Sequence, residues 1–326
     1  MGADLAAAAD APRRGVSVVI PNHNHARYLE RCVAQHLAQT RPPDEIVIVD
    51  DASTDESLDI LGRLTSSDPA VRVLRRAERG GPNRAIGEGV AACRYDLIRV
   101  SSVDDLIEPS LLERSEAELR RHPTAGLFFC DPGEAIGGTR RRYRLALAES
   151  PAYLAPAGAM RLLRRNFFVP SSTALVFRAE ALRQVGGFRQ PLEWHADWFA
   201  KHAILLRFGG CYVPENLVFA WREAGDYSST RVGGPGEQAL LFRWLDVLAD
   251  EPGADLMDRF RAALLLSEYS FRALYWLARD PRHRRYLSAA LVRRVVVQSV
   301  WTLVRPVVPL RWRGFVRRRR ARRHRP

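Results

Sequence analysis

Two adjacent aspartates, Asp104 and Asp105, follow the apolar run Leu97 to Val100 in the segment LIRVSSVDDLIEP. Neighbouring carboxylates repel each other unless water or a cation lies between them. Magnesium and manganese sites often combine one or two carboxylates with phosphate oxygens of a ligand. Both acids could instead occupy the first turn of a helix, but Pro109 delays the start of the next helix. We therefore expect Asp105, together with Asp104, to bind Mn2+ or Mg2+.

Polar residues also end two other apolar runs. His23 follows the run that contains Pro21, and Asp50 and Asp51 follow the run Ile46 to Val49. If these runs are parallel strands, their carboxyl ends meet at one edge of a sheet, where ligands bind. Asp50 and Asp51 could alternatively cap the next helix, since good capping residues follow them. Three polar clusters at one edge favour a nucleotide or metal site.

The glycine-rich segment Arg79 to Gly89, RGGPNRAIGEG, stands between two predicted strands. Its backbone amides could hold a phosphate, and Arg79 or Arg84 could supply positive charge. The segment matches neither the dinucleotide-binding fingerprint nor the P-loop, so a plain turn is the alternative.

Asp197 lies between Trp194 and Trp198 in the segment WHADWFA. A carboxylate in such an apolar setting is a candidate general base. The alternative is an acidic residue on a helix surface with aromatic neighbours. The adjacent His195 is either a substrate contact or a structural histidine.

The elements that must hold these residues follow from the hydrophobic pattern. Strand-like segments at 16–20, 46–49, 71–76 and 96–101 alternate with segments of helical periodicity. Such alternation predicts a parallel sheet covered by helices on both faces. The pattern is mixed after residue 124, and amphipathic helices are expected near the C-terminal end.

The order of these motifs resembles the family 2 glycosyltransferases, inverting enzymes of the GT-A fold. The resemblance rests on VSVVIPNHN, EIVIVDDAS, the glycine-rich segment, the paired aspartates, GGF, DWFA and YVPE, from Val16 to Ser229. It implies an α/β fold, with a Rossmann-like, mostly parallel sheet flanked by helices and a helical C-terminal region. The implied activity is inverting transfer of a sugar from a nucleotide-sugar donor to an acceptor hydroxyl, in bacterial polysaccharide or glycolipid assembly.

The resemblance also implies a role for each candidate residue. Asp197 is the implied catalytic base, and Asp105 and Asp104 are the implied metal ligands. The implied donor-binding residues are Pro21, His23, Asp50, Asp51, Arg84 and Asp104. The implied acceptor or loop residues are Trp194, His195, Arg222 and Ser228. The family commonly has a further aspartate where this chain has Ser102.

Two other functions fit the same residues. A sugar nucleotidyltransferase would use a similar nucleotide site and metal carboxylate but would release pyrophosphate. A catalytically degenerate domain would bind a nucleotide sugar without turnover, and the absence of a carboxylate at Ser102 is compatible with it.

Positive charge is concentrated at the C-terminal end of the chain. The net charge is +13, and fifteen arginines but no acidic residue follow Asp280. Together with the apolar stretch around Trp301, this predicts attachment to an anionic membrane surface rather than to nucleic acid. No run of about 18 apolar residues is present, which argues against a membrane-embedded enzyme. The four cysteines lie far apart without metal-site spacing, which favours a reducing compartment. We therefore expect a cytoplasmic protein, peripheral on the inner face of the plasma membrane.

The expected organisation has four parts. They are a flexible leader (1–14), a GT-A domain (15–232) with a nucleotide-binding half (15–123) and an acceptor half (124–232), a helical extension (233–281), and a basic amphipathic tail (282–326).

Overall fold

The computed structural model describes residues 12–165, 168, 170–222, 236–250 and 255–304. The chain forms two compact units, Met1–Leu256 and Met257–Pro326.

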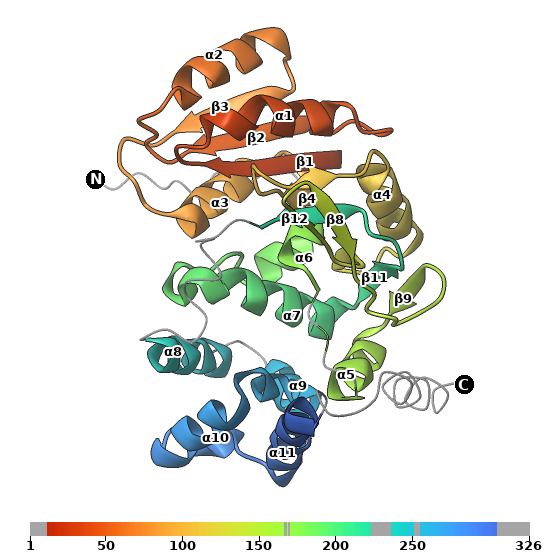
Figure 1. Cartoon of the computed structure of the whole chain (residues 1–326), viewed down its shortest axis with the longest axis vertical. Helices are drawn as coiled ribbons and strands as arrows, with labels where there is room; N and C mark the ends of the chain where they lie inside the picture. Colours follow the sequence, from red (N-terminus) through yellow and green to blue (C-terminus); the bar gives the residue numbers. More distant parts are fainter. Residues whose placement is uncertain (1–11, 166–167, 169, 223–235, 251–254, 305–326) are drawn as a thin grey trace. The chain divides into compact units, whose positions relative to one another are not determined.

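The first unit is built on an eight-stranded sheet with the strand order β3-β2-β1-β4-β10-β6-β11-β9 (Figure 1). The first four strands in this order are parallel to one another. They are β1 (Arg13–Asn22), β2 (Glu45–Asp50), β3 (Val71–Arg75) and β4 (Tyr95–Val100). All residues of β2 are buried, as expected of a central parallel strand. The predicted parallel sheet is therefore confirmed.

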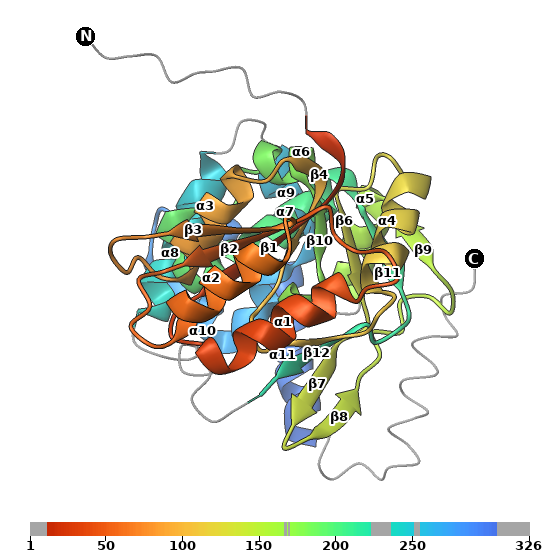
Figure 2. The ribbon, with the colours of Figure 1, turned by 90° about the horizontal axis from the view of Figure 1, so that it is seen from above.

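Helices cover both faces of this parallel half. Side chains of α1 (Ala26–Leu37) and α2 (Ser57–Ser67) share a core with Val18, Ile20 and Ile48 on one face. The helix α3 (Pro82–Ala91) packs on the other face, against Val47 and Val49. Figure 2 shows the two arrangements on opposite sides of β1 and β2.

Helix α3 lies unusually close to the sheet because Gly89 faces it. A Cβ atom added at Gly89 would lie 2.5 Å from Cγ1 of Val19 and 3.0 Å from Cγ2 of Val49. The absence of a side chain at this position lets α3, and the glycine-rich segment that leads into it, approach the ends of β1 and β2.

The second half of the sheet is mixed. Strand β10 (Val176–Arg178) is antiparallel to both β4 and β6 (Leu127–Cys130), whereas β11 (Gly210–Val213) is parallel to β6. A smaller sheet has the order β5-β12-β7-β8. The remaining elements of this unit are β5 (Leu106–Ile107), β7 (Gly133–Ile136), β8 (Thr139–Arg142), β9 (Ala152–Leu154), β12 (Val218–Trp221), α4 (Leu111–Arg121), α5 (Pro156–Arg165), η1 (Ser172–Ala174), α6 (Ala179–Gln184), η2 (Gln190–His195), α7 (Ala196–Phe208) and α8 (Glu237–Ala249).

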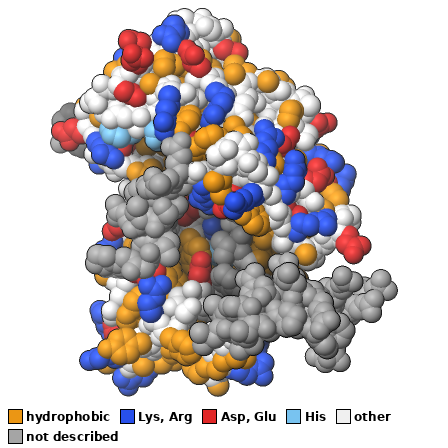
Figure 3. Space-filling view, in the orientation of Figure 1, with side chains coloured by type: hydrophobic (Ala, Val, Ile, Leu, Met, Phe, Trp, Pro, Cys, Tyr) orange, Lys and Arg blue, Asp and Glu red, His pale blue; other side chains and the backbone are white. Residues whose placement is uncertain are grey.

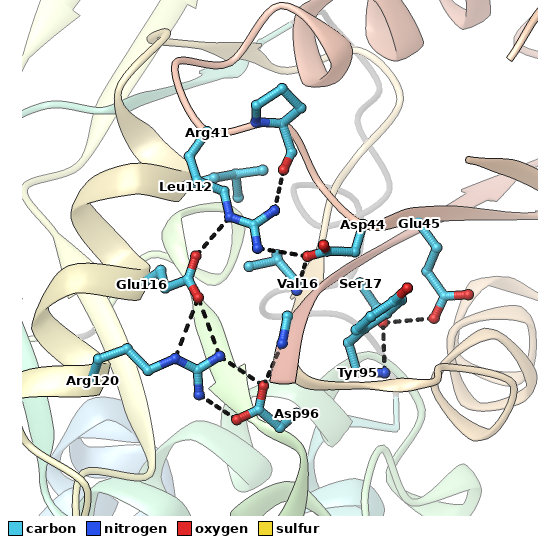
Figure 4. A network of polar contacts seen from close by, with 12 residues as sticks. Val16, Ser17, Arg41, Asp44, Glu45, Tyr95, Asp96, Leu112, Glu116 and Arg120 are labelled. Atoms are coloured by element: carbon cyan, nitrogen blue, oxygen red, sulfur yellow. Dashed lines mark hydrogen bonds and ion pairs between the residues drawn. The ribbon is translucent and has the colours of Figure 1, made fainter. Parts of the chain in front are cut away.

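A charged network fixes the amino end of β1 (Figure 4). Arg120 on α4 pairs with Asp96, which also accepts a hydrogen bond of 2.9 Å from the backbone N–H of Gly15. Asp44 accepts one of 2.8 Å from the N–H of Val16 and pairs with Arg41 at 2.7 Å. These contacts lie at the amino ends of the strands, so the carboxyl ends remain for a site.

The second unit is helical, which agrees with the predicted helical C-terminal region. Helix α9 (Asp255–Ala263) leads into it, and η3 (Leu265–Tyr269), α10 (Ser270–Arg279), η4 (Arg284–Tyr286) and α11 (Ala289–Val304) follow. Helix α10 packs against α11. Among the described residues, no helix is both long and apolar enough to cross a membrane.

Candidate functional site

The carboxyl ends of β2, β1 and β4 are neighbours in the sheet. Asn22, the last residue of β1, pairs with Asp50, the last residue of β2. On the other side of β1, the N–H of Ser101, just after β4, donates a hydrogen bond of 2.9 Å to the carbonyl of Val19. The structure thus brings the predicted polar clusters together at one edge.

Asp50 is buried and holds the turn after β2. Its carboxylate accepts hydrogen bonds from the Asn22 amide at 3.0 Å, and from the Ser53 hydroxyl and backbone N–H at 2.6 and 3.1 Å. This arrangement fixes the position of the next residue, Asp51.

Asp51 connects the end of β2 to the glycine-rich segment. Its carboxylate accepts hydrogen bonds of 2.8 Å from the N–H groups of Gly80 and Gly81, and it pairs with the Arg76 guanidinium. Gly81 has a φ of 87°, a left-handed conformation that suits glycine. His23 Nδ1 lies 2.8 Å from the Asp51 carbonyl oxygen. In this structure Asp51 therefore orients the loop, and its predicted contact with a base stays a prediction.

Two other predicted donor residues lie near this edge. Pro21 is half-buried in β1. Arg84 is exposed on α3, where its guanidinium lies 3.4 Å from the Glu88 carboxylate. The predicted contacts of Pro21 and Arg84 with the donor stay predictions.

Helix α1 holds the backbone of the acidic loop, residues 101–105, and of the strand that follows. Arg31 donates a hydrogen bond of 2.8 Å to the carbonyl of Asp104. The Gln35 amide donates to the carbonyl of Asp105 at 3.4 Å and accepts from the N–H of Ile107 at 3.1 Å. Gln39 repeats this arrangement one turn later, with Glu108 and Leu112. This row was not among the residues predicted from the sequence, although its spacing of four residues was a usable signal.

The first prediction concerns this row. Gln35→Leu would leave the Ile107 N–H and the Asp105 carbonyl without their side-chain partner. We expect it to lower the free energy of unfolding by about 1–3 kcal/mol in chemical denaturation. Gln184→Leu is the control, because the Gln184 amide contacts Glu180 on the exposed side of α6. Equal stability of the Gln35 variant and the wild type would contradict the role of this row.

Asp105 is the most unusual carboxylate of the acidic loop. It is 4% exposed, and its Oδ1 accepts a hydrogen bond of 3.3 Å from the N–H of Trp221 on β12. Its Oδ2 is buried without a hydrogen-bond partner. Burial, and secondarily the charge of Asp104, raise the pKa of Asp105 to about 7, against the opposing effect of Arg99.

Asp104 is half-buried and accepts a hydrogen bond from the Ser102 hydroxyl. Ser102, at the position where the family commonly has a further aspartate, therefore contacts one of the two aspartates of the acidic loop.

Arg99 places a fully buried guanidinium within β4. It donates a hydrogen bond of 2.8 Å to the carbonyl of Thr173 in η1, and burial lowers its pKa while Asp105 opposes that effect. The sequence analysis read this position as part of an apolar strand. Its positive charge partly offsets the buried charge of Asp105.

The residues of the acidic loop fit a hard divalent cation. An unpaired carboxylate oxygen and a second carboxylate one residue away are ligands that Mg2+ and Mn2+ prefer. Among the described residues, no group of three or more His, Cys, Asp or Glu side chains is arranged to hold a metal ion. A cation here would therefore need oxygens from a bound ligand.

Asp197 lies in the first turn of α7. Its Oδ1 accepts a hydrogen bond of 2.6 Å from the N–H of Trp198, and the side chain is half-buried. The neighbouring His195 is buried, which lowers its pKa to about 4 although Asp197 opposes the shift. The single lysine of the chain, Lys201, follows Asp197 by one turn and donates to the Ser172 hydroxyl at 2.8 Å.

Segment η1 connects the two acidic positions. Ser172 accepts a hydrogen bond from Lys201, and the adjacent Thr173 accepts one from Arg99. Lys201 stands one turn after Asp197 on α7, and Arg99 lies on the strand that leads to Asp105. Neither Lys201 nor Arg99 was among the site residues predicted from the sequence.

The segment before Asp197 contacts the glycine-rich side of the site. The Asn83 amide at the start of α3 donates to the carbonyl of Glu193 in η2. Arg243 on α8 donates to the carbonyl of Pro191 at 2.8 Å and pairs with Glu193 at 3.0 Å. Glu193 has a φ of 46°, so these contacts hold a backbone conformation that is unfavourable for glutamate.

The remaining predicted acceptor residues are only partly described. Arg222 follows β12, lies 3.3 Å from Glu134 and acts electrostatically on Asp105. Ser228 lies outside the described residues, as does the side chain of Trp194.

Comparisons with known proteins agree with this fold. A family model described as "Glycosyl transferase family 2" matches residues 17–186. The O-antigen biosynthesis protein RfbC of Myxococcus xanthus is 30% identical over 226 residues, which cover 67% of this chain and 16% of that protein. The chain also covers 55% of an uncharacterized glycosyltransferase of Nostoc sp.. It thus spans about half or less of the length of these relatives.

Two solved structures share the architecture. S. aureus TarS in complex with UDP-GlcNAc has a TM-score of 0.61 at 16% identity, covering 76% of this chain and 70% of that chain. The mannosyltransferase PcManGT from Pyrobaculum calidifontis, in complex with GDP-Man and Mn2+, has a TM-score of 0.52 at 18% identity, covering 90% and 89%. These similarities identify the fold as GT-A-like.

Proposed function

Because the chain belongs to glycosyl transferase family 2, we propose that it moves a sugar from a nucleotide-sugar donor to an acceptor hydroxyl with inversion at the anomeric carbon. One observation carries the proposal. Asp105 is a buried carboxylate with an unpaired oxygen, beside Asp104, at the ligand-binding edge of the sheet and inside the matched range. An isolated buried charge is costly, and a donor-bound cation would compensate it.

Asp105 and Asp104 would hold Mn2+ or Mg2+, whose charge would stabilise the departing diphosphate. Two carboxylates leave coordination positions that phosphate oxygens and water would fill. The complex of the Pyrobaculum mannosyltransferase with GDP-Man and Mn2+ supports this ligand combination.

Asp197 would accept the proton of the attacking hydroxyl. Its position in the first turn of α7 supports this role, since one oxygen is held by the Trp198 N–H while the side chain stays partly accessible. Asp197 lies beyond the matched range 17–186, so its role rests on this geometry and on the resemblance.

The donor would lie along the edge formed by Pro21, His23, Asp50, Asp51 and Arg84. Asp51 would act there by fixing the glycine-rich segment as well as through any contact with the base. Trp194, His195, Arg222 and Ser228 would contact the acceptor or close over the diphosphate.

A thermal-shift screen of nucleoside diphosphates and nucleotide sugars, with and without Mn2+, tests the donor site. We expect one class of nucleotide to raise the melting temperature, and to raise it further when Mn2+ is present, because cation and diphosphate bind together. No shift with any nucleotide at millimolar concentration would contradict the proposed donor site.

Ser102→Asp tests the geometry of the acidic loop and is the second prediction. Ser102 is exposed and contacts Asp104, so a carboxylate there would add a third ligand to the cation. We expect the Mn2+ concentration that half-saturates donor binding to fall about tenfold, as for one added charged ligand. Ser102→Asn is the uncharged control. Equal cation affinity of Ser102→Asp and the wild type would show that this position does not face the cation.

We further propose that the acceptor belongs to bacterial polysaccharide or glycolipid assembly, at the cytoplasmic face of the plasma membrane. The similarity to an O-antigen biosynthesis protein supports the acceptor class. The arginine-rich residues 305–326, which lie outside the described residues, would attract anionic lipid.

A further inference from the structure

Helices α10 and α11 expose an apolar face. Of the seven large hydrophobic side chains that are exposed among the described residues, six lie on these two helices and are 41–57% exposed. They are Phe271, Tyr275, Val292, Val296, Val297 and Val300. We call them the α10–α11 face. Their concentration on two helices distinguishes them from apolar residues scattered singly over a surface.

Each of these two helices also has a second apolar side, which is packed. On α11, Leu291 and Val295 are buried, whereas Val292, Val296 and Val300 form an exposed row at intervals of four residues. On α10, Ala273 and Leu277 are buried, whereas Phe271 and Tyr275 are exposed one turn apart. Packing among the described residues therefore accounts for only one side of each helix.

Arginines accompany the apolar side chains on these helices. The guanidinium of Arg279 donates a hydrogen bond of 2.5 Å to the Tyr275 hydroxyl and lies 5.3 Å from the ring centroid. Arg293 is exposed and, by helical geometry, lies on the same side of α11 as Val297 and Val300. Figure 3 shows orange and blue side chains intermingled where Figure 1 draws α10 and α11.

The charge of this region is one-sided. Residues 270–304 contain seven arginines and a single acidic residue, Asp280, which is itself paired with Arg282 at 3.2 Å. The chain then continues for 22 residues that include ten arginines and no acidic residue.

We propose that the α10–α11 face docks into the headgroup region of an anionic phospholipid membrane. A helix with exposed valines and flanking arginines suits a position in the plane of the interface, with guanidinium groups at the level of lipid phosphates. Tyr275, with its apolar ring and polar hydroxyl, suits the same depth. The absence of a membrane-spanning helix among the described residues is compatible with attachment in the plane.

Charge argues against the main alternative, a second copy of the chain. A symmetric dimer through this face would bring two arginine-rich surfaces together, which costs free energy unless counter-ions intervene. An anionic lipid surface instead complements the arginines while it buries the valines. The inference rests on the proposed membrane location, and it is independent of the sugar chemistry.

Flotation of the full-length chain with vesicles tests the inference. The vesicles are phosphatidylcholine alone, or phosphatidylcholine with 30% phosphatidylglycerol. The test variant combines Val296→Gln with Val300→Gln, which removes two exposed apolar side chains and leaves every arginine in place. Tyr143→Gln is the control, because Tyr143 is similarly exposed but lies after β8 in the first unit.

We expect the wild type and the Tyr143 variant to float with the anionic vesicles. The double variant should partition at least about tenfold less, because it lacks two valines that the membrane would bury. Thermal unfolding of the double variant should match the wild type, since neither valine is buried. Equal partitioning of the double variant and the wild type would overturn the inference. So would a dimeric wild type that the double variant converts to a monomer, because a second copy would then cover the face.

This test is independent of the proposed activity. Failure to release nucleoside diphosphate from any donor would refute the glycosyl transfer and leave the flotation result intact. A wild type that does not float but shows full turnover on a water-soluble acceptor would refute the membrane docking and leave the glycosyl transfer intact.

Discussion

Replacing Asp197 with asparagine is expected to lower kcat for sugar transfer by about 10²- to 10⁴-fold while donor affinity stays the same. Asparagine keeps the size of the side chain and can still accept the hydrogen bond from the Trp198 N–H. It cannot accept a proton from the acceptor hydroxyl. The measurement is steady-state transfer together with the Kd of the donor by calorimetry.

A matched control for this variant is Glu180→Gln on α6, an exposed carboxylate paired with Arg183. It should retain full transfer. An Asp197→Asn variant with undiminished kcat would refute Asp197 as the base. A variant with unchanged kcat and weaker donor binding would assign Asp197 to the donor site instead.

Asp105→Asn is expected to abolish the effect of divalent cations on donor binding and to change how stability depends on pH. Burial raises the pKa of Asp105 in the folded protein to about 7, from the value of about 3.9 that is usual for an exposed aspartate. Between these values the folded chain binds more protons than the unfolded chain, so rising pH lowers the free energy of unfolding. The decrease in the free energy of unfolding is complete above pH 7 and amounts to about 4 kcal/mol.

Asparagine at position 105 carries no charge, so this contribution to the pH dependence should disappear. The comparison uses the slope of stability against pH from 5 to 8, because removing Asp105 also changes the surroundings of the buried Arg99. Chemical denaturation at several pH values provides the measurement. Asp59→Asn, an exposed acidic residue on α2, should retain the wild-type slope. A parallel slope for Asp105→Asn would contradict the raised pKa.

The cation provides a second measurement on the same variant. Mn2+ together with a nucleoside diphosphate should raise the melting temperature of the wild type at pH 8 and leave that of Asp105→Asn unchanged. An equal rise in both proteins would mean that the cation binds elsewhere.

The parallel half of the fold follows directly from the sequence. Runs such as Ile46 to Val49 are buried on both faces in the structure, and their uninterrupted apolar character is what a central parallel strand requires. The positions of the polar clusters follow as well, because Asp50 and Asp51 come directly after such a run. Local pattern and global fold agree in this part of the chain.

The sequence does not indicate that strand β10 runs antiparallel to its neighbours. It has only three residues, Val176–Arg178, and its place between β4 and β6 depends on pairing with segments far away in the sequence. A short apolar segment carries no information about which strands it joins.

The side-chain partners in the site also could not be predicted from the local sequence pattern. Arg99 looks like an interruption of an apolar strand, and only the fold shows that its charge acts on Asp105 and that it donates a hydrogen bond to Thr173. The hydrogen bonds from the N–H groups of Gly80 and Gly81 to the Asp51 carboxylate depend on the path of the loop, which the positive φ of Gly81 allows. The hydrogen bonds of Asp51 with Gly80 and Gly81 and of Arg99 with Thr173 join residues 29, 30 and 74 positions apart.

The most direct test of the central claim is analysis of the products formed by the full chain. The reaction contains Mn2+, an acceptor alcohol and the nucleotide sugar that gives the largest thermal shift. We predict release of nucleoside diphosphate in equal amount to a glycoside of inverted anomeric configuration, and loss of both products in Asp105→Asn. Pyrophosphate release would contradict the account and indicate a nucleotidyltransferase. Tight donor binding without any product would contradict it too, and would indicate a degenerate domain that only binds nucleotide sugar.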